Sequence, residues 1–430
     1  MIIFFDKFCV CNGAKKYILS CNKYTDVYSD MKKFEFEIAC MRGNLGIVKS
    51  LYKHGMNIHD GLCEACEYGH IDIVKFLCES ESDNIVVCKD ILCNSFYSAC
   101  QGGSLEVAMY LYKHYSNVIN IKYNNYAVLY VSFSNGNLDV VKYLCETCGV
   151  TKNDIISGKN SLLGKACCKG HIDVIRYVCD MYGFTIDDVK LGNYKVLKCA
   201  SEKGHINIVE YFCEKYNIDI NDNNTRRDIN AILRYASYND QIDIVKYLCE
   251  KFDLLIGDIR SDDNYILKCL CYYGYIDILR YICDKYKFVK SDIMEDGNHI
   301  LYLACEKNNS DIVIYLCEKY NITIDDILNV NDGAHGLFYL ACNGGCLDVV
   351  KYLCDKYKLT AGDIKSCNNY ALQCISMCNY VDIAKYLCEK YPTIKPDVLS
   401  HAYKNNNINF HTVKIAYDVC RDRIKKIIKS

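Results

Sequence analysis

Residues 163–179 read LGKACCKGHIDVIRYVC, and this stretch recurs along the chain with the same spacing of apolar, small and acidic residues. Further copies of its second half include HINIVEYFC from His205, QIDIVKYLC from Gln241 and CLDVVKYLC from Cys346. The acidic position of this half, Asp173 in the quoted copy, serves as the reference position. Self-similarity at a fixed period is the signature of a repeat architecture.

The reference position returns at a nearly constant interval. Successive spacings are 26, 34, 33, 34, 34, 36, 34, 34, 37 and 34 residues, which gives eleven copies. Such regularity predicts one stacked array in place of several unrelated domains. The reference positions are Gly46, Asp72, Glu106, Asp139, Asp173, Asn207, Asp243, Asp277, Asp311, Asp348 and Asp382.

The apolar columns predict two helices in every copy. Positions one, two, five and six after the reference are apolar in nearly all copies, which is the spacing of one helix face. Ten residues before the reference stands a Leu or Phe, such as Leu163, and three residues later the column is mostly Ala, such as Ala166. A small residue one helical turn after the Leu or Phe lets the short first helix pack closely against the second.

The turn between the two helices has a column of its own, three residues before the reference. Every member is Gly, Asn or Asp, the residues that tolerate a left-handed backbone at the least cost. The sequence therefore predicts an all-α protein in which a helix, a tight left-handed turn and a second helix repeat eleven times. The column is Gly43, Gly69, Gly103, Gly136, Gly170, Gly204, Asp240, Gly274, Asn308, Gly345 and Asn379.

The repeated pattern Leu-x-x-Ala-x-x-x-Gly-His/Asn-aliphatic-Asp-Ile/Val-Val-x-x-Leu resembles the ankyrin repeat over about residues 34–391. The resemblance implies an ankyrin-repeat solenoid of about 11–12 stacked helix-turn-helix units. The choice of residues in copies such as HIDVIRYVCDM, with Cys and Tyr at fixed positions, resembles that of the ankyrin arrays of giant DNA viruses of amoebae. That finer likeness implies a viral protein that acts on host proteins, with a ubiquitin-ligase component as one candidate partner.

Two features depart from the usual ankyrin pattern. The Thr-Pro-Leu-His signature survives only as its Leu or Phe, which leaves the shape of the finger between copies open. The Gly that caps the second helix is kept as Gly55, whereas residues such as Tyr216 and Tyr320 stand in its place elsewhere, and Asn217 or Asn321 could supply the reversal. The longer spacings add residues in NDNNTRRDIN (221–230) and around 331–336, which we expect to form surface loops. The short first spacing predicts a tight turn between the first two copies.

Three segments are expected from this pattern. Residues 1–33 form an N-terminal cap or degenerate repeat, residues 34–396 the array, and residues 397–430 a capping repeat with a basic tail. The first residues lack the features of a signal peptide, and no apolar run has the length of a membrane helix. The odd number of cysteines favours a reducing compartment, so we expect an intracellular, by default cytoplasmic, protein.

The 31 cysteines invite a disulfide or zinc interpretation. Sixteen of them, however, occupy two repeated columns where a small hydrophobic residue fits, so we expect buried, reduced thiols. The pairs Cys63/Cys66 and Cys145/Cys148 have zinc-like spacing but no second pair to complete a tetrahedral site, so no metal is expected. One column contains Cys78, Cys145, Cys179, Cys213, Cys249, Cys283, Cys317, Cys354 and Cys388; the other contains Cys40, Cys66, Cys100, Cys167, Cys271, Cys305 and Cys342.

No arrangement of residues indicates catalysis or a cofactor. His70, His171 and His205 follow the turn column, where an imidazole is expected to hydrogen-bond neighbouring backbone. The segment Ser157-Gly158-Lys159 lacks the first Gly and the final Ser or Thr of a phosphate loop. A net charge of −2 gives no reason to expect a nucleic acid partner. We therefore expect no enzyme activity, no cofactor, no small-molecule substrate and no membrane partner.

Binding is expected on the first helices. In ankyrin arrays the finger tips and the exposed side of the first helix line a concave groove that holds protein partners. The columns nine and five residues before the reference should face that groove, and the former varies in size and charge and is rich in Tyr and Arg, which dominate interface hot spots. The alternative is a solvated face that varies for no reason. The candidate partner-binding residues are Tyr97, Tyr130, Lys198, Arg234, Lys268, Tyr302 and Tyr339.

The leading hypothesis is thus a non-enzymatic scaffold that binds a partner protein. A structural component of a virion or host assembly is the first alternative. The second is a metal-binding protein that uses cysteines outside the two columns, such as Cys9, Cys11 and Cys21.

Overall fold

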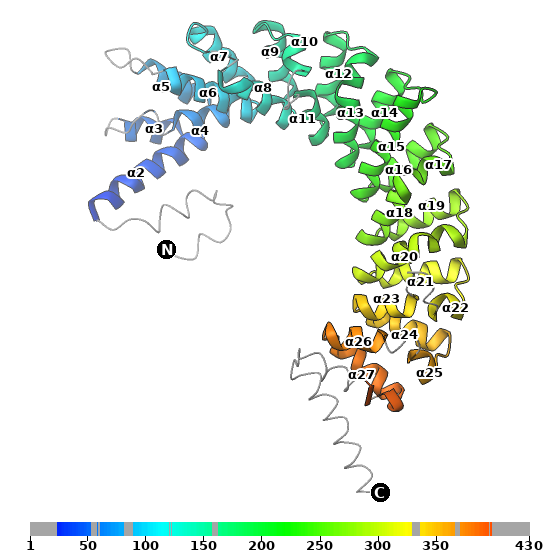
Figure 1. Cartoon of the computed structure of the whole chain (residues 1–430). Coiled ribbons are helices and arrows are strands. Elements are labelled where there is room, and N and C mark those ends of the chain that lie inside the picture. Colours follow the sequence, from blue (N-terminus) through cyan, green and yellow to red (C-terminus); the bar gives the residue numbers. More distant parts are fainter. Residues whose placement is uncertain are drawn as a thin grey trace. The chain divides into compact units, whose positions relative to one another are not determined.

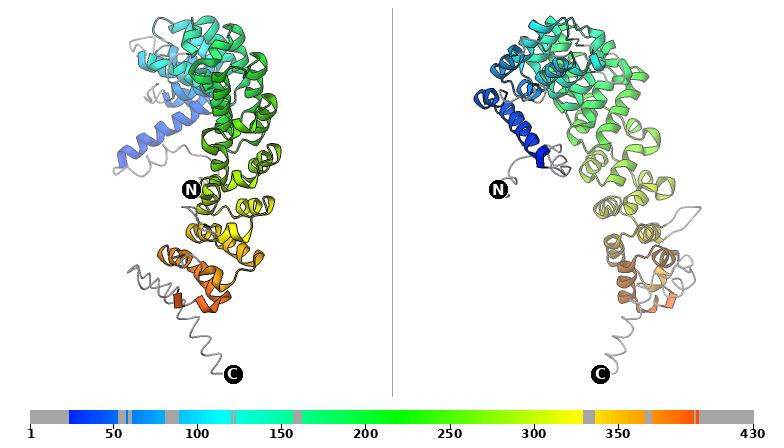
Figure 2. Two further views of the ribbon diagram at one scale, coloured as in Figure 1. Left: turned by 45° about the vertical axis from the view of Figure 1, so that its right-hand side comes forward. Right: turned by 90° about the vertical axis from the view of Figure 1, so that its left-hand side faces the viewer.

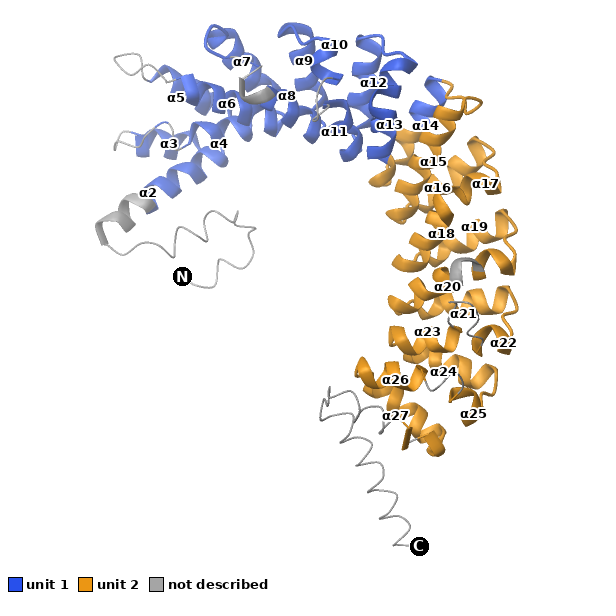
Figure 3. Cartoon of the chain, in the orientation of Figure 1, with its two compact units in different colours: residues 1–200, 210–216 blue, residues 201–209, 217–430 orange. Residues whose placement is uncertain are grey.

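The computed structural model describes residues 24–52, 58, 61–80, 89–119, 121, 123–156, 162–328, 336–365, 370–394 and 396–397, and all regular structure in these residues is helical (Figure 1). The chain divides into two compact units (Figure 3). The first unit holds residues 1–200 and 210–216, and the second holds residues 201–209 and 217–430. Each unit is described separately below.

The first unit begins with paired helices in chain order. Its helices are α2 (Tyr24–Met41), α3 (Leu45–Tyr52), α4 (Leu62–Glu67), α5 (Ile71–Glu79), α6 (Lys89–Gly102), α7 (Leu105–Tyr115), α8 (Tyr123–Asn135), α9 (Leu138–Thr147), α10 (Lys152–Ile156), α11 (Leu162–Lys169) and α12 (Ile172–Met181). Helices α13 (Ile186–Glu202) and α14 (Ile206–Lys215) contribute residues to both units.

The second unit continues the same alternation. Its helices are α15 (Asn223–Tyr238), α16 (Ile242–Lys251), α17 (Ile256–Ile259), α18 (Ser261–Tyr273), α19 (Ile276–Lys285), α20 (Lys290–Glu306), α21 (Ser310–Lys319), α22 (Ile324–Leu328), α23 (Leu337–Gly344), α24 (Leu347–Lys356), α25 (Ala361–Ile364), α26 (Tyr370–Met377) and α27 (Val381–Lys390), followed by the 3₁₀ turn η3 (Pro392–Ile394).

Each unit has two layers of helices. First helices pack on first helices, as α4 does on α6 and α18 on α20, while second helices such as α16 and α19 pack on one another (Figure 2). The Leu or Phe column and the Ala column of the first helices are buried, and so is the apolar column five residues after the reference. All sixteen cysteines of the two columns are buried as well, as predicted. The helix-turn-helix copies read from the sequence are therefore confirmed.

The turn column has a left-handed backbone in all eleven copies. Its φ angles run from 58° at Asp240 to 85° at Gly274, which confirms the prediction for every member. The side chain that follows the turn in the next copy covers it. His171 lies over Gly136, and His70 lies over Gly43. These imidazoles also hydrogen-bond the preceding copy, as predicted for them: His70 Nε2 lies 2.9 Å from the Met41 carbonyl oxygen and His171 Nε2 lies 2.8 Å from that of Ser134.

Other residue types make the same contact between copies. Ser104 Oγ donates to the Glu67 carbonyl oxygen at 3.1 Å, and Asn309 Nδ2 donates to the carbonyl oxygens of Cys271 and Tyr272 at 2.8 and 3.0 Å. The contact therefore depends on a short donor above an open turn, and not on histidine itself.

A second left-handed residue ends the second helix. The left-handed residue, at which the chain reverses direction, lies ten residues after the reference. This is one residue beyond the tyrosines that replace the usual Gly. Asn217 and Asn321 supply it, as predicted, and Gly55 lies outside the described residues. Lysine occupies the same position twice, which adds the strain of an L side chain to the turn. The residues with positive φ here are Gly149, Gly183, Asn217, Asp253, Lys287, Asn321 and Lys358.

The expected surface loop at residues 221–230 is wrong. Residues from Asn223 onward form the first turns of α15, and Ile229 and Asn230 are buried. The reason is a helix cap, because the Asp222 carboxylate accepts hydrogen bonds from the backbone N–H groups of Asn224 and Thr225 at 2.9 and 3.2 Å. The other expected loop, around residues 331–336, and the expected tight turn at residues 53–60 lie almost entirely outside the described part of the chain.

Short helices occupy the place of the fingers. Helices α10, α17, α22 and α25 are each preceded by a residue whose backbone N–H donates to an Asp three positions later. In α25, for example, Thr360 N and Oγ1 both lie 2.7 Å from the Asp363 carboxylate, and Thr360 accepts from the Asp363 N–H in return. This reciprocal arrangement is a capping box. The aliphatic residue after each Asp, such as Ile364, is buried and anchors the short helix.

The capping aspartates also join successive copies. A basic residue of one finger reaches the capping Asp of the next: Lys152 Nζ lies 2.6 Å from Asp188 in the first unit, and Arg226 Nη1 lies 2.7 Å from Asp258 in the second. Arg260 pairs with Asp292 in the same way. We call this series the finger ladder.

A left-handed turn of three residues connects finger to first helix in two copies. The turns are Gly192–Tyr194, inside α13, and Asp262–Asn264, inside α18, with φ between 53° and 62°. Tyr194 and Asn264 are buried at the ends of these turns. Consecutive left-handed L residues are strained, so the burial of the last one holds each turn in place.

We predict that Gly136→Ala destabilises the protein far more than Gly149→Ala. Both residues have φ near 70°, so both substitutions carry the same backbone strain of about 1–2 kcal/mol. A Cβ at Gly136 would lie 2.3 Å from His171 Nδ1, whereas nothing lies within 4 Å of a Cβ at Gly149. The difference, measured by urea unfolding, should be about 1–3 kcal/mol, the cost of a displaced hydrogen bond. Equal losses would show that His171 does not hold the turn.

We predict that Lys358→Gly stabilises the protein by about 0.5–1 kcal/mol, because it relieves a positive φ of 50°. The matched control is Lys385→Gly, an exposed residue in the middle of α27, which should destabilise by about 1 kcal/mol. Thermal unfolding of the two variants checks the prediction, which fails when both shift the midpoint in the same direction.

The finger ladder predicts a defined pH dependence. Burial alone would raise the pKa of Asp258, but the Leu255 N–H, the Asn230 amide and the Arg226 guanidinium together lower it. A lowered pKa means that Asp258 contributes stability above its unfolded pKa of about 3.9, and that this contribution is lost as pH falls through the folded value. We expect Asp258→Asn to cost about 1–2 kcal/mol at pH 7 and progressively less below about pH 4.

Urea unfolding of both proteins between neutral pH and pH 3 measures this difference. Asp325→Asn is the control, since Asp325 is exposed and its side chain makes no hydrogen bond or ion pair within the described chain. A gap between wild type and Asp258→Asn that stays constant over this pH range would contradict the role given to the carboxylate.

Candidate protein-binding face

The predicted binding residues lie on the first helices, on one face of that layer in each unit. In the first unit Tyr97 belongs to α6, Tyr130 to α8 and Lys198 to α13. In the second unit they belong to α15, α18, α20 and α23. All are half-buried: Tyr97, Tyr130, Lys198, Arg234, Lys268, Tyr302 and Tyr339.

Their polar ends are engaged by neighbouring side chains. In the first unit Lys165 Nζ lies 5.0 Å from the centre of the Tyr130 ring. In the second unit Arg234 pairs with Asp262, and Lys268 Nζ lies 2.5 Å from Asp263. The residues thus form a series of local contacts and do not converge on a single point.

Aromatic contacts hold the remaining members. The Tyr302 ring lies 6.1 Å from that of His299, and the Tyr339 ring lies 6.5 Å from that of Tyr370 in an edge-to-face arrangement. Side chains held this way lose little freedom on binding, because their rotamers are fixed beforehand.

Several exposed aromatic residues of this face do not belong to the predicted set. Tyr235, Tyr238, Tyr265, Tyr273 and Tyr370 are exposed by 40% or more of their surface. The sequence could have identified Tyr238 as a residue of this face, because it lies in the column five residues before the reference, which was expected to face the groove. Of the others, Tyr235 directly follows Arg234 of the column nine residues before the reference, and Tyr265, Tyr273 and Tyr370 lie three to five residues from that column, at positions that vary between copies.

The opposite layer uses its tyrosines in contacts between copies. The Tyr177 hydroxyl donates to Glu146 of the preceding copy at 2.8 Å, and Arg280 lies 5.0 Å from the centre of the Tyr315 ring of the following copy. These tyrosines are architectural and half-buried, whereas Tyr238 and Tyr273 of the first-helix layer, which also contact each other between copies, are exposed.

Burial makes cysteines of the two repeated columns, such as Cys283 and Cys40, poorly suited to nucleophilic chemistry. Burial raises the pKa of Cys283 to about 11, although the Tyr320 hydroxyl partly opposes the shift. Burial likewise raises the pKa of Cys40 to about 12. Few thiolates form at such positions near neutral pH. Within the described residues, no group of three or more His, Cys, Asp and Glu side chains could hold a metal ion.

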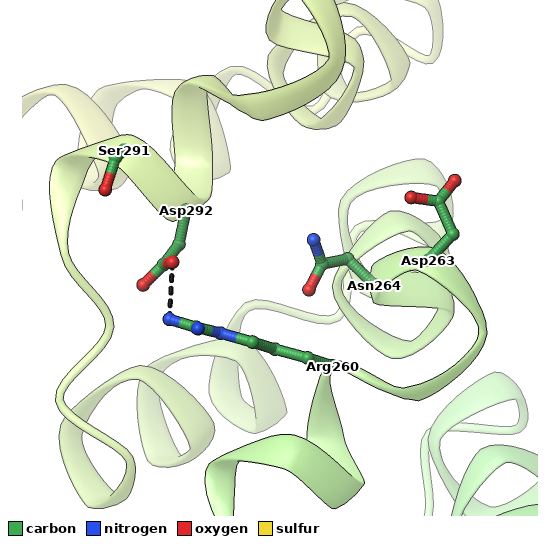
Figure 4. A pocket seen from close by; sticks show the side chains of 5 residues that line it. All are labelled: Arg260, Asp263, Asn264, Ser291 and Asp292. Atoms are coloured by element: carbon green, nitrogen blue, oxygen red, sulfur yellow. Dashed lines mark hydrogen bonds and ion pairs between the residues drawn. The ribbon is translucent and has the colours of Figure 1, made fainter.

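A small polar hollow lies beside the finger ladder of the second unit (Figure 4). In the close-up, Arg260 extends along its floor to Asp292, while Ser291, Asn264 and Asp263 stand around it. The hollow is open, and its main charge is already paired within the protein. It is therefore a feature of the ladder and offers no reaction chemistry.

Helices long and apolar enough to cross a membrane are absent from the described residues. No curated protein matches the sequence. Residues 148–224 and 233–327 match the family model for ankyrin repeats, which represents three copies of the repeat. Ankyrin repeats suggest a role in protein–protein interaction. With these matches and the two helical layers of each unit, the fold is an all-α ankyrin-repeat solenoid.

Proposed function

We propose that this protein is a non-enzymatic interaction scaffold that binds a partner protein through the first-helix face of its repeats. The observation that carries the proposal is the contrast between columns. Buried columns keep apolar or small residues from copy to copy, whereas the column nine residues before the reference changes among Glu, Cys, Tyr, Gly, Lys, Arg and Gln. A face that varies on a constant framework is suited to recognising one specific partner.

The physical properties of the face support this function. Each copy of a solenoid contacts only its neighbours, which leaves an extended surface available to a ligand. Tyrosine and arginine on that surface supply large contact areas and bidentate hydrogen bonds, as in interface hot spots. Arg234 and Lys268 are held by Asp262 and Asp263, so binding would order few side chains.

The nature of the partner belongs to the same proposal. The likeness to the ankyrin arrays of giant viruses of amoebae supports a viral protein that acts inside the host cell on a host protein. The buried thiols of the two cysteine columns are compatible with a reducing compartment.

Replacing Tyr130, Arg234 and Tyr302 together by Ala should abolish capture of the partner from an amoebal lysate, identified by mass spectrometry. The thermal midpoint should fall by no more than a few degrees, because each side chain is only half-buried. Capture that survives the triple substitution would contradict the proposed face.

The control carries the same residue types on the second helices. Tyr110, Arg280 and Tyr352, replaced together by Ala, remove two tyrosines and one arginine from the opposite layer of the two units. This variant should still capture the partner. Loss of capture in both variants, with both folded by circular dichroism, would show that neither layer alone forms the binding surface.

A further inference from the structure

A cluster of three tyrosines projects from the turn edge of the second unit. Tyr238 ends α15, Tyr273 ends α18, and Tyr275 precedes α19. The rings of Tyr238 and Tyr273 lie 4.8 Å apart and edge to face, and that of Tyr275 stacks on Tyr273 at 5.8 Å. Tyr238 and Tyr273 are exposed by 42% and 40% of their surface. We call these three residues the tyrosine cluster.

The cluster is held in one arrangement by a hydrogen bond. The Tyr273 hydroxyl donates to the Tyr238 hydroxyl at 2.9 Å. This bond, together with burial and the nearby Tyr238, raises the pKa of Tyr273 to about 12. Even an ordinary phenol, with a pKa of about 10, is neutral at pH 7. The exposed rings therefore present a neutral, ordered aromatic surface.

Elsewhere in this unit, cations of the chain cover the tyrosine rings. Lys246 lies 5.8 Å from the centre of the Tyr281 ring, and Lys307 lies 4.4 Å from the centre of the Tyr272 ring, next to the cluster. No lysine or arginine of the described residues lies over Tyr238, Tyr273 or Tyr275. Where the rings are not covered by one another or by Tyr272, their electron-rich faces are therefore not taken by a cation of the described chain.

Two carboxylates beside the cluster also lack a cation. Asp240 occupies the turn after Tyr238, and Asp277 is the second residue of α19, two residues after Tyr275; both are exposed. Burial and the nearby Asp277 raise the pKa of Asp240, so the two carboxylates lie close enough to repel each other. Within the described chain neither side chain has an ion-pair partner. A cation placed between them would relieve this repulsion.

We propose that the tyrosine cluster with Asp240 and Asp277 docks an arginine-bearing segment of a partner protein. The guanidinium is planar, so it stacks on a tyrosine face while its N–H groups donate to a carboxylate. Lysine satisfies the charge but not the stacking, which makes arginine the preferred side chain. This inference rests on the proposed scaffold function and assigns one contact of the partner to a surface outside the seven predicted residues.

The test measures binding of a fluorescein-labelled peptide of alternating glycine and arginine by fluorescence anisotropy at 150 mM NaCl. Matched glycine–lysine and glycine–glutamate peptides serve as probes of the charge. The glycine–arginine peptide should bind the wild-type protein at least fivefold more tightly than the glycine–lysine peptide, and the glutamate peptide should show no binding.

The decisive variant is Asp240→Asn with Asp277→Asn. The array already uses Asn at both columns, as Asn308 and Asn207 respectively, so the fold should be kept. Affinity for the arginine peptide should fall at least tenfold. Asp311→Asn, in the same column as Asp277 but on α21, is the control and should leave the affinity unchanged.

Aromatic variants separate stacking from charge. Tyr238→Phe with Tyr273→Phe keeps the ring faces and should retain most of the affinity, whereas Tyr238→Ala with Tyr273→Ala should lose it at the same circular dichroism signal. Equal binding of arginine and lysine peptides, or binding indifferent to the paired Asn substitutions, would overturn the inference. In that event, partner capture that still depends on Tyr130, Arg234 and Tyr302 would leave the proposed function intact.

Discussion

The structure depends on a left-handed turn that is covered from the next copy. The turn reverses the chain between two helices, and where it is glycine the missing Cβ opens a slot into which the following copy inserts a side chain. That side chain hydrogen-bonds carbonyl oxygens at the end of the preceding first helix, as Asn309 does at Cys271 and Tyr272. A single local conformation thus forms each copy and couples it to its neighbour, since the same slot serves both purposes.

The sequence predicted this framework because each column can be read eleven times. The Leu, Ala and turn columns predict the helices and their buried faces, and the spacing of the two cysteine columns predicts that they belong to the core. The finger helices were missed although their signal is present. Thr360 and Asp363 have the spacing of a capping box, but this signal is short and differs from the Thr-Pro-Leu-His signature of the usual ankyrin finger.

The stretch at residues 221–230 shows that amino-acid composition alone does not decide between a loop and a helix. Its charged and amide residues are typical of a loop, yet Asp222 caps the helix that follows and Arg226 reaches Asp258 of the next copy. A polar residue is compatible with a helix when its partner comes from another part of the chain, and a single sequence does not show that partner. The residues of the candidate binding column lie on the first helices, as predicted, because helical periodicity fixes which side a residue faces. Its half-burial and its ion pairs depend on neighbouring copies, and so they became visible only in the structure.

The buried cysteines have a consequence for how such an array could be observed. Several thiols of the second-helix column lie against a tyrosine of the next copy, as Cys283 does against Tyr320 and Cys354 against Tyr391. A thiol of this kind becomes reactive only when the interface above it opens, and nearly every copy carries one. The protein therefore contains a natural set of reporters, spaced along its length, from which the local opening of each interface can be followed by alkylation without introducing a single label.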